Sequence, residues 1–325
     1  MSWRGCRVLV TGGEGFIGSH LVGALAREGA QVRVLTYYNP FGRRGWLDAY
    51  EADVEIVQGD VRDAHRVLSV VLQRDVVFHL AALVGIPYSY EAPESYVATN
   101  VVGTLNVLNA CRAADVTRMV HTSTSEVYGS ACRVPIDETH PLQPQSPYSA
   151  SKIGADMLAQ SFFLTYGLPV AIVRPFNTYG PRQSMRAIIP TVLSQLYDGT
   201  DELRLGSLDP RRDFNYVEDT VRGFMAVAQC DQALGQVVNV GSGRDVSVGE
   251  VVNLLMAVVD RYPKITTDAQ RVRPPNSEVQ RLVCDHTRAW EWAGWRPQVS
   301  LEEGLRRTAE WVRENLPAQA KAYHI

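Results

Sequence analysis

The feature that most constrains this chain is a glycine turn near its start, GGEGFIG at residues 12–18. A short apolar run, CRVLVT at residues 6–11, precedes the turn, and residues 19–28 follow it with apolar positions at helical spacing. Glycines at this spacing allow a tight turn, let backbone N–H groups approach a pyrophosphate, and let the helix pack closely on the sheet. Because the turn lies between the first predicted strand and its helix, the pattern predicts a dinucleotide-binding βα unit.

Strand-like and helix-like segments alternate along the first half of the chain. Alternation of this kind predicts a parallel sheet with helices on both faces. The expected fold class is therefore α/β, a Rossmann-like doubly wound parallel sheet. The apolar runs that predict further strands are residues 32–35, 54–57, 76–80, 119–123 and 170–173, and the longest helical stretches are residues 96–114 and 149–166.

Beyond about residue 176 the sequence becomes rich in turns, and strand character returns only at residues 237–240. This change predicts a smaller C-terminal substrate domain that is interleaved with the first domain. The expected dinucleotide-binding domain covers residues 1–176 with a returning segment near 236–260, and the expected nucleotide-sugar-binding domain covers residues 177–235 and 261–325.

Charge and cysteine content exclude several classes of protein. The formal net charge of -3 gives no global basic field for nucleic acid or an anionic membrane. The five cysteines are scattered without a Cys-x-x-Cys pair, which argues against a disulfide framework and a zinc site and favours a reducing, cytoplasmic compartment. No signal-peptide pattern and no apolar stretch near the ~20 residues that span a bilayer is present in the sequence, so neither secretion nor membrane insertion is expected.

The end of the second predicted strand leaves the choice of dinucleotide open. Folds that bind NAD usually place an acid there for the ribose hydroxyls, whereas residues 36–39 read TYYN. NAD is the expected cofactor, but NADP is not excluded, since Arg43 or Arg44 could pair with a 2′-phosphate. Asp60, after the third strand, could accept a hydrogen bond from the adenine amino group or could cap the helix that starts near Ala64.

A tyrosine and a lysine, Tyr148 and Lys152, lie four residues apart on one face of a predicted helix. A phenol with a pKa of about 10 is a poor base, but a neighbouring ammonium and a positive nicotinamide ring both favour the phenolate. Such a pair can take a proton from a sugar hydroxyl. The pattern is common on helices, but here TSTSEVYG at residues 122–129 adds hydroxyls and a carboxylate at a strand end, where parallel sheets bind ligands.

In combination these motifs resemble the extended short-chain dehydrogenases/reductases that act on nucleotide sugars, over nearly the whole chain. Membership of that family implies a tightly held cofactor that is reduced and reoxidised within one turnover. The motifs that carry the resemblance are the glycine turn, residues 122–129, the Tyr148/Lys152 pair, RPFN at 174–177 and RDF at 212–214. The segments most similar to 4,6-dehydratases of N-acetylglucosamine nucleotides are YYN at 37–39, IPYSY at 86–90 and NTYGPRQS at 177–184.

The resemblance implies a role for each matched catalytic residue. Tyr148 would be the base at the C4 hydroxyl, Lys152 would hold the nicotinamide ribose and lower the tyrosine pKa, and Thr124 would hydrogen-bond the C4 oxygen. Once C4 is a ketone, Glu126 would remove the C5 proton and help to expel the C6 hydroxyl. Dehydratases of the thymidine-diphosphoglucose type have Asp where this chain has Ser125, so Glu126 would have to serve as both base and acid.

The resemblance also implies two sets of binding residues. In the substrate set, the arginines would give charge-assisted bonds to diphosphate oxygens. The cofactor set comprises Gly12, Gly15, Phe16, Ile17, Gly18, Thr36, Asp60, Val61, Leu80, Ala81 and Ala82, together with Tyr148 and Lys152. The substrate set comprises Tyr88, Asn177, Arg182, Arg212, Asn239 and Arg273.

Other activities are compatible with the same motifs. The main alternative is decarboxylation of a UDP-glucuronic acid, because oxidation at C4 of a hexuronic acid gives a β-keto acid, and Ser125 and Arg212 could bind its carboxylate. SPYSASK at residues 146–152 favours the dehydratase. A 4-epimerase is less favoured because it needs no carboxylate at position 126. A non-catalytic cofactor-binding protein is disfavoured because it needs none of the four side chains Tyr148, Lys152, Thr124 and Glu126.

The two long predicted helices, residues 96–114 and 149–166, have apolar residues on more than one face. One contact with a sheet cannot bury all of these residues. Members of the family pair these helices in a four-helix dimer interface, so a homodimer is expected.

Overall fold

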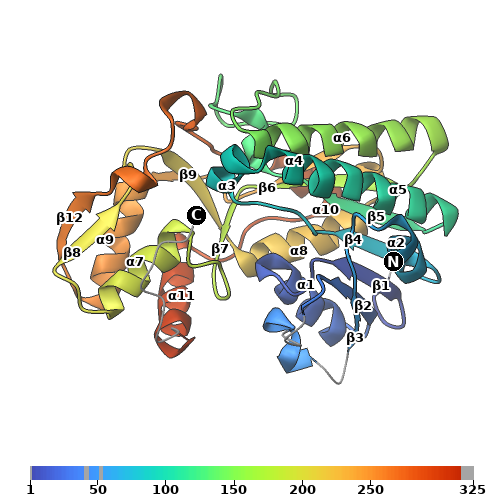
Figure 1. Ribbon diagram of the computed structural model, residues 1–325, viewed down its shortest axis with the longest axis horizontal. Coiled ribbons are helices and arrows are strands. Elements are labelled where there is room, and N and C mark those ends of the chain that lie inside the picture. The colour runs from blue at the N-terminus through green and yellow to red at the C-terminus, as the bar shows by residue number, and fades with distance from the viewer. Residues whose placement is uncertain (1, 40–43, 51–53, 316–325) are drawn as a thin grey trace.

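The structure is a computed structural model, and it describes residues 2–39, 44–50 and 54–315. Figure 1 shows two lobes side by side. The larger lobe holds the main sheet, and the smaller lobe holds helices α7, α9 and α11. The glycine turn lies at the start of α1, and the tyrosine–lysine pair lies in the first turns of α6.

A seven-stranded sheet forms the centre of the larger lobe, and every pairing within it is parallel. The strand order is β10-β6-β5-β4-β1-β2-β3, so the order reverses between β1 and β4, and the carboxyl ends of these two strands border a crevice. This sheet confirms the predicted Rossmann-like class. The strands are β1 (Arg7–Thr11), β2 (Gln31–Thr36), β3 (Val54–Gln58), β4 (Val76–His79), β5 (Arg118–Thr122), β6 (Val170–Pro175) and β10 (Val237–Val240).

Helices cover both faces of the sheet, each burying an apolar stripe against the β-branched strand residues. One face packs against α1 (Phe16–Arg27), α8 (Val217–Ala228) and α10 (Thr287–Ala293). The opposite face packs against α2 (Ala64–Val71), α5 (Gly103–Ala113) and α6 (Pro147–Tyr166).

The helix predicted over residues 96–114 is broken into three parts. It runs as α4 (Pro93–Tyr96), a π-helical segment (Val97–Val102) and α5, preceded by α3 (Ile86–Glu91). The other long helix, α6, is regular and has clear sequence signals at its ends. A capping box formed by Ser146 and Ser149 and a proline in the first turn start it, and Gly167 ends it with a φ of 68°.

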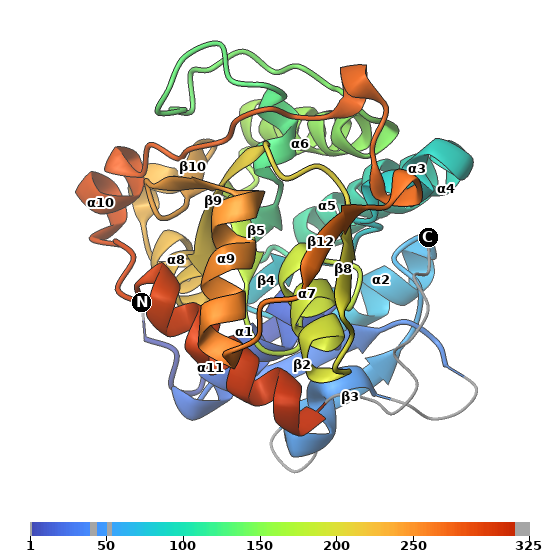
Figure 2. The same ribbon diagram turned by 90° about the vertical axis from the view of Figure 1, so that its left-hand side faces the viewer.

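The smaller lobe has its own apolar core between α7 (Ile188–Tyr197), α9 (Val248–Val259) and α11 (Leu301–Asn315), which face the viewer in Figure 2. Two small sheets complete it. One has the order β11-β9-β7, with β7 (Asn177–Tyr179), β9 (Arg211–Tyr216) and β11 (Asp245–Ser247). The other pairs β8 (Glu202–Leu205) with β12 (Lys264–Thr267) in parallel.

The two cores divide the chain differently from the predicted boundaries. Helix α8 contributes Val221, Phe224 and Val227 to the core of the larger lobe, whereas α9 contributes Val251 and Leu255 to the core of the smaller lobe. Residues 217–240 and α10 therefore lie with the larger lobe and α9 lies with the smaller lobe, whereas the predicted returning segment covers residues 236–260. The physical reason is that β10 lies parallel to β6, and α8 is the helix that packs against the sheet on the way from one strand to the other.

Within the described ranges, no helix has the length and apolar character required to cross a membrane. The five cysteines are free thiols. The described residues also contain no group of three or more potential metal ligands.

Candidate active site

The glycine turn joins the end of β1 to α1 and lies against the end of β4. Gly12 has a φ of +69°, and a Cβ there would lie 2.8 Å from the backbone nitrogen of Ala81. A Cβ at Gly18 would lie 2.3 Å from the Gly12 carbonyl oxygen, so packing alone requires both glycines. A Cβ at Gly15 would meet only that same carbonyl, at 3.4 Å. The open side of Gly15 is where a ligand can approach the backbone.

Helix α1 begins at Phe16 with Gly15 as its N-cap, and neither a capping side chain nor an acid in the first turn neutralises its start. The first-turn N–H groups are therefore available to an anion. The side chains of Phe16 and Ile17 pack against the cores of the smaller and larger lobes, so these residues face the turn through their backbone. An open glycine and an uncapped helix start fit the pyrophosphate of a dinucleotide.

The loop after β4 lies beside the glycine turn, as predicted for Leu80, Ala81 and Ala82. The Thr11 hydroxyl oxygen accepts hydrogen bonds from the backbone N–H groups of Leu80 and Ala81, each at 3.2 Å. The same hydroxyl lies 2.8 Å from Nδ1 of the buried His79. These contacts hold the carboxyl ends of β1 and β4 together at the point where the strand order reverses.

The end of β2 carries an acid that the sequence analysis missed. Thr36 is buried as the last residue of the strand, and the next N–H group, that of Tyr37, donates to Oε1 of Glu14 at 2.9 Å. Glu14 belongs to the glycine turn, so its position in the sequence gave no sign that it reaches β2. Arg43, one of two predicted partners for a 2′-phosphate, lies outside the described residues, and Arg44 lies within them.

The predicted adenine contacts after β3 are partly engaged by the protein. Asp60 forms a salt bridge with Arg62 at 2.5 Å, which lowers the pKa of the carboxyl group. Helix α2 is capped by Asp63, whose side chain accepts from the N–H of Arg66, so the interpretation of Asp60 as a cap is wrong. The side chain of Val61 is buried in the core.

Tyr148, Thr124 and Glu126 converge where β5 ends and α6 begins. Thr124 caps the short 3-10 helix Ser125–Tyr128, and its side chain is hydrogen-bonded to Tyr148, which interacts electrostatically with Glu126. Glu126 is half-buried, and no hydrogen bond to its carboxylate is formed by the described residues, so it is not tied to loop amides. Ser125 is 2% exposed.

Burial is the largest influence on the pKa of both Tyr148 and Lys152. Burial raises the pKa of Tyr148 above its usual value, and the hydrogen bond to Thr124 opposes the rise. Burial lowers the pKa of Lys152 to about 8, and its Nζ donates to the Thr122 carbonyl at 2.6 Å. Within the protein alone, desolvation is the largest influence on the pKa of Tyr148, and the lowering by Lys152 stays a prediction.

A buried polar cluster behind Lys152 fixes α6 to the sheet. Asp156 forms a salt bridge with Arg174 of β6 at 2.9 Å, and Nε2 of His121 in β5 lies 3.3 Å from the second oxygen of the same carboxylate. All three side chains are almost fully buried, and burial lowers the pKa of His121. Ser123 also donates to Asp156, at 2.8 Å. The cluster holds Tyr148, two turns earlier on α6, at a set position over the strand ends.

Asn239 belongs to the same buried region. Its side chain has no exposed area, accepts a hydrogen bond from the Tyr128 hydroxyl at 2.7 Å, and donates to the Ile136 carbonyl at 3.1 Å. This arrangement does not support the substrate contact expected of Asn239. The residue lies in β10, the edge strand of the sheet, and both ends of its amide are paired within the protein.

Two predicted substrate arginines, Arg212 and Arg273, meet at Glu278. Arg212 is bonded to the Glu278 carboxylate at 2.8 Å, Nη1 of Arg273 lies 3.5 Å from the same oxygen, and this nitrogen has no hydrogen-bond partner. Arg212 also interacts electrostatically with Glu126, although desolvation by burial lowers its pKa. Glu278 was missed because a single acid in a turn-rich segment carries no spacing signal. Two cations and one anion leave a net positive charge near the Glu126 carboxylate.

Asn177 and Tyr88 lie where a substrate can reach them. The Oδ1 atom of Asn177 is buried without a hydrogen-bond donor. Tyr88 is 38% exposed, and its ring lies 6.2 Å from that of Tyr96, which in turn lies 6.2 Å from that of Tyr148.

Arg182 lies on the cofactor side of the junction. Its guanidinium packs over the ring of Tyr50 at 5.7 Å, and the neighbouring Pro181 carbonyl is bonded to His20 of α1 at 3.0 Å. Nη1 of Arg182 is buried without a partner. These contacts place Arg182 beside the helix that follows the glycine turn, and its role in substrate binding stays a prediction.

Asn100 is a further site residue that the sequence did not reveal. It lies in the π-helical segment, accepts from the N–H of Leu83 at 2.9 Å, and donates to Oγ of Ser151 at 3.0 Å. It therefore joins the loop after β4 to the first turns of α6. π-Helical turns are frequent at functional sites, but no simple residue spacing predicts one.

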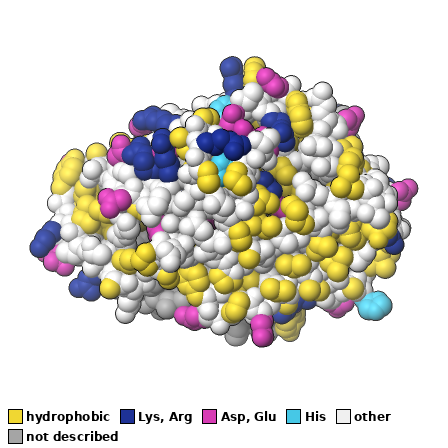
Figure 3. Space-filling model, turned by 90° about the horizontal axis from the view of Figure 1, so that it is seen from above, with side chains coloured by type: hydrophobic (Ala, Val, Ile, Leu, Met, Phe, Trp, Pro, Cys, Tyr) yellow, Lys and Arg dark blue, Asp and Glu magenta, His cyan; other side chains and the backbone are white. Residues whose placement is uncertain are grey.

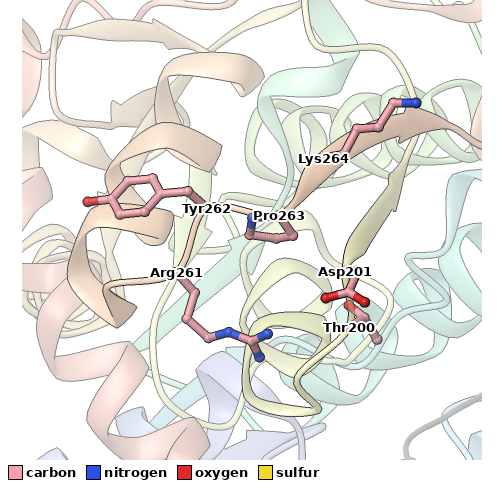
Figure 4. A pocket seen from close by; sticks show the side chains of 6 residues that line it. All are labelled: Thr200, Asp201, Arg261, Tyr262, Pro263 and Lys264. Atoms are coloured by element: carbon pink, nitrogen blue, oxygen red, sulfur yellow. The ribbon is translucent and has the colours of Figure 1, made fainter.

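A hollow of about 320 Å³ lies elsewhere, between Arg261, Lys264 and their neighbours in the smaller lobe. Figure 4 shows its six lining side chains, which come from the loops around β8 and β12. Arg261 donates to the Leu196 carbonyl at 2.6 Å. None of these residues belongs to the predicted site.

Known proteins are similar to this chain over almost its whole length. The protein-family profile described as GDP-mannose 4,6 dehydratase matches residues 9–308. A dTDP-glucose 4,6-dehydratase of Actinoplanes sp. is 34% identical, over 95% of this chain and 98% of its own.

Three solved structures are similar throughout. DesIV, a dTDP-glucose 4,6-dehydratase from Streptomyces venezuelae solved with NAD, has 34% identity and a TM-score of 0.87, covering 95% of this chain and 97% of its own. MoeE5 in complex with UDP-glucuronic acid and NAD has 31% identity and a TM-score of 0.85, covering 95% and 100%. TunA, an NAD-dependent NDP-hexosamine 5,6-dehydratase, has 33% identity and a TM-score of 0.82, covering 94% and 97%.

Proposed function

The chain belongs to the NAD-dependent nucleotide-sugar 4,6-dehydratase family of extended short-chain dehydrogenases/reductases, and from this premise we propose that it dehydrates a nucleotide-diphosphate hexose to a 4-keto-6-deoxy sugar nucleotide. The observation that carries the proposal is the convergence of Tyr148, Thr124 and an unbonded Glu126 beside the open glycine turn. NAD, when bound, would accept the hydride from C4 and return it to C6 after the loss of water, with a solvent-derived proton added at C5, so that the product is the 4-keto-6-deoxy sugar.

The four side chains have different roles in the proposed reaction. Tyr148 accepts the proton of the C4 hydroxyl, Thr124 holds the C4 oxygen by a hydrogen bond, and Lys152 holds the nicotinamide ribose. The C4 ketone makes the C5 proton acidic. The Glu126 carboxylate removes that proton and passes it to the C6 hydroxyl, which leaves as water. Glu126 performs both proton transfers because Ser125 is not a strong acid.

For the substrate we favour an N-acetylglucosamine nucleotide. The segments at residues 37–39, 86–90 and 177–184 support this choice, since they are most similar to dehydratases of that type. The similarity to TunA, whose substrate is described as an NDP-hexosamine, supports it as well. Arg212 and Arg273 would bind the diphosphate, and Asn177 and Tyr88 would border the sugar.

Decarboxylation of a nucleotide uronic acid is the second candidate, since MoeE5, a similar protein, is described in complex with UDP-glucuronic acid. The burial of one expected carboxylate-binding residue argues against it, since the side chain of Ser125 is 2% exposed.

Product analysis in heavy water separates the two activities. With neutral UDP- and dTDP-hexoses, the dehydratase yields a product lighter by one water molecule, with one deuteron at C5. Carbon dioxide released from UDP-glucuronic acid, without dehydration of any neutral sugar nucleotide, would overturn the proposal. Tyr148→Phe is the control, because loss of the C4 base should slow either reaction by about 10²-fold or more while the bound dinucleotide is retained.

A further inference from the structure

The structure brings an acid to the place where a Rossmann fold discriminates between its two dinucleotides. An acid at the end of the second strand hydrogen-bonds the adenosine ribose hydroxyls of NAD, and it is this acid that repels the 2′-phosphate of NADP. The second strand of this chain ends in TYYN and has no acid of its own.

The carboxylate of Glu14 lies at this strand end. Its Oε1 atom accepts from the Tyr37 N–H at 2.9 Å, so the carboxylate faces the first residue after β2 from the glycine turn. Residues 45 and 46 pack against the backbone of Glu14. Trp46 donates its N–H to the Glu14 carbonyl at 3.3 Å, and a Cβ at Gly45 would lie 2.6 Å from that oxygen.

The second oxygen of the same carboxylate has no partner. Oε2 of Glu14 is buried without a hydrogen-bond donor, and burial raises the pKa of the group. A buried acceptor without a donor destabilises the protein unless a ligand supplies one. A ribose hydroxyl is such a donor, whereas a phosphate dianion carries no proton to give and has the same sign of charge.

Arg62, a cation beside Tyr37, is already paired with another acid. It interacts with Tyr37, but its guanidinium is bonded to both carboxylate oxygens of Asp60. The Asp60–Arg62 pair is neutral overall, so Arg62 does not offset the carboxylate of Glu14.

We propose that Glu14 takes the role of the missing acid of β2: it accepts a hydrogen bond from the adenosine ribose and excludes NADP. The inference rests on the proposed function only in requiring a nicotinamide dinucleotide. It adds that a residue of the glycine turn, and not the second strand, determines which dinucleotide is held.

The test is competition between the two dinucleotides. Purified protein is equilibrated with equal concentrations of NAD and NADP, free nucleotide is removed, and the bound dinucleotides are released by denaturation and counted by mass spectrometry. Equilibrium is verified by reaching the same ratio from protein loaded with either one. We expect wild type to hold mainly NAD, and Glu14→Gln to shift the ratio at least tenfold toward NADP.

The glutamine variant keeps an amide oxygen for the Tyr37 N–H, so it should fold as wild type does. Glu28→Gln, at an exposed position after α1, makes the same change in net charge as the control. An unchanged ratio in Glu14→Gln, or an equal shift in Glu28→Gln, would overturn the inference. Because bound dinucleotide is counted without turnover, the result does not depend on whether the protein dehydrates a sugar.

Discussion

Glu126 differs from most acids of this chain in having no hydrogen bond to its carboxylate from the described residues. A carboxylate without a hydrogen bond can accept or donate a proton without first breaking a contact. We expect Glu126→Gln to oxidise C4 but to stop before elimination, because an amide cannot remove the C5 proton. In heavy water, quenched reactions should contain an unrearranged 4-keto hexose nucleotide without deuterium at C5. Dehydration at the wild-type rate would contradict this role.

Lys152 makes a prediction about stability and pH. Burial lowers its pKa from 10.5 to about 8, so between pH 8 and 10.5 the unfolded chain binds more protons than the folded one. Raising the pH through this window therefore stabilises the folded protein through Lys152, by up to about 1.4 kcal/mol per pH unit. Denaturant unfolding of wild type and Lys152→Met should show the difference in unfolding free energy changing in favour of wild type. A difference that does not vary with pH would contradict it.

Several site residues could be predicted because their chemistry follows a fixed spacing. Tyr148 and Lys152 share a helix face at four residues, and the turn glycines are spaced for a backbone that must approach an anion. The contacts of Asn239 could not be predicted because its partner Tyr128 is 111 residues away. Glu14 was overlooked because it reaches β2 only after the turn has folded. Contacts between distant segments leave no periodic trace in a sequence.

The element that carries the dinucleotide site, the turn before α1, provides a matched pair of variants. Gly15 has a φ of -77°, which alanine adopts readily, and its Cβ would meet little. We expect Gly15→Ala to fold with a stability within about 1 kcal/mol of wild type and to retain at least tenfold less dinucleotide, because the methyl group occupies the open side.

For Gly18→Ala we expect a large loss of stability, in contrast to the small loss expected for Gly15→Ala. The Cβ at position 18 would press on the Gly12 carbonyl, so α1 must move away from β1 at a cost of about 1–3 kcal/mol or more. Thermal unfolding and the dinucleotide content of purified protein measure both effects. If Gly15→Ala is the less stable variant, the glycine at 15 serves packing and not ligand approach.

The burial of each strand and the chemistry of its side chains explain which elements could be predicted from the sequence. Most residues of the parallel strands β1, β2, β4, β5, β6 and β10 are buried, so these strands appear as apolar, β-branched runs. β9 reads RRDFNY and gives no such signal, because its polar residues are buried with partners: Asp213 accepts from Ser242, Gly243 and Cys284. Helices α8 and α9 are both amphipathic, so periodicity could not assign them to a lobe.

At the scale of the whole molecule, apolar side chains remain exposed along α6 and the π-helical segment beside it. Figure 3, seen from the side on which α6 lies, shows hydrophobic side chains gathered over one half of the surface. Those exposed by more than 40% are Val97, Val102, Met157, Leu164 and Tyr166. A patch of this kind on one side of a globular protein indicates an interface.

We therefore predict that the chain is a homodimer that pairs these helices across a two-fold axis. Met157→Asp combined with Val102→Asp places two charges on each side of the interface, and like charges in a buried contact oppose association. Sedimentation of wild type at micromolar concentration should give twice the chain mass of 36.0 kDa, and the double variant should give the single mass with the same helix content. Tyr262→Asp is the control, since Tyr262 is 69% exposed on the smaller lobe and lies outside the patch. A monomeric wild type, or dissociation caused equally by Tyr262→Asp, would show that the patch does not pair two copies of this chain.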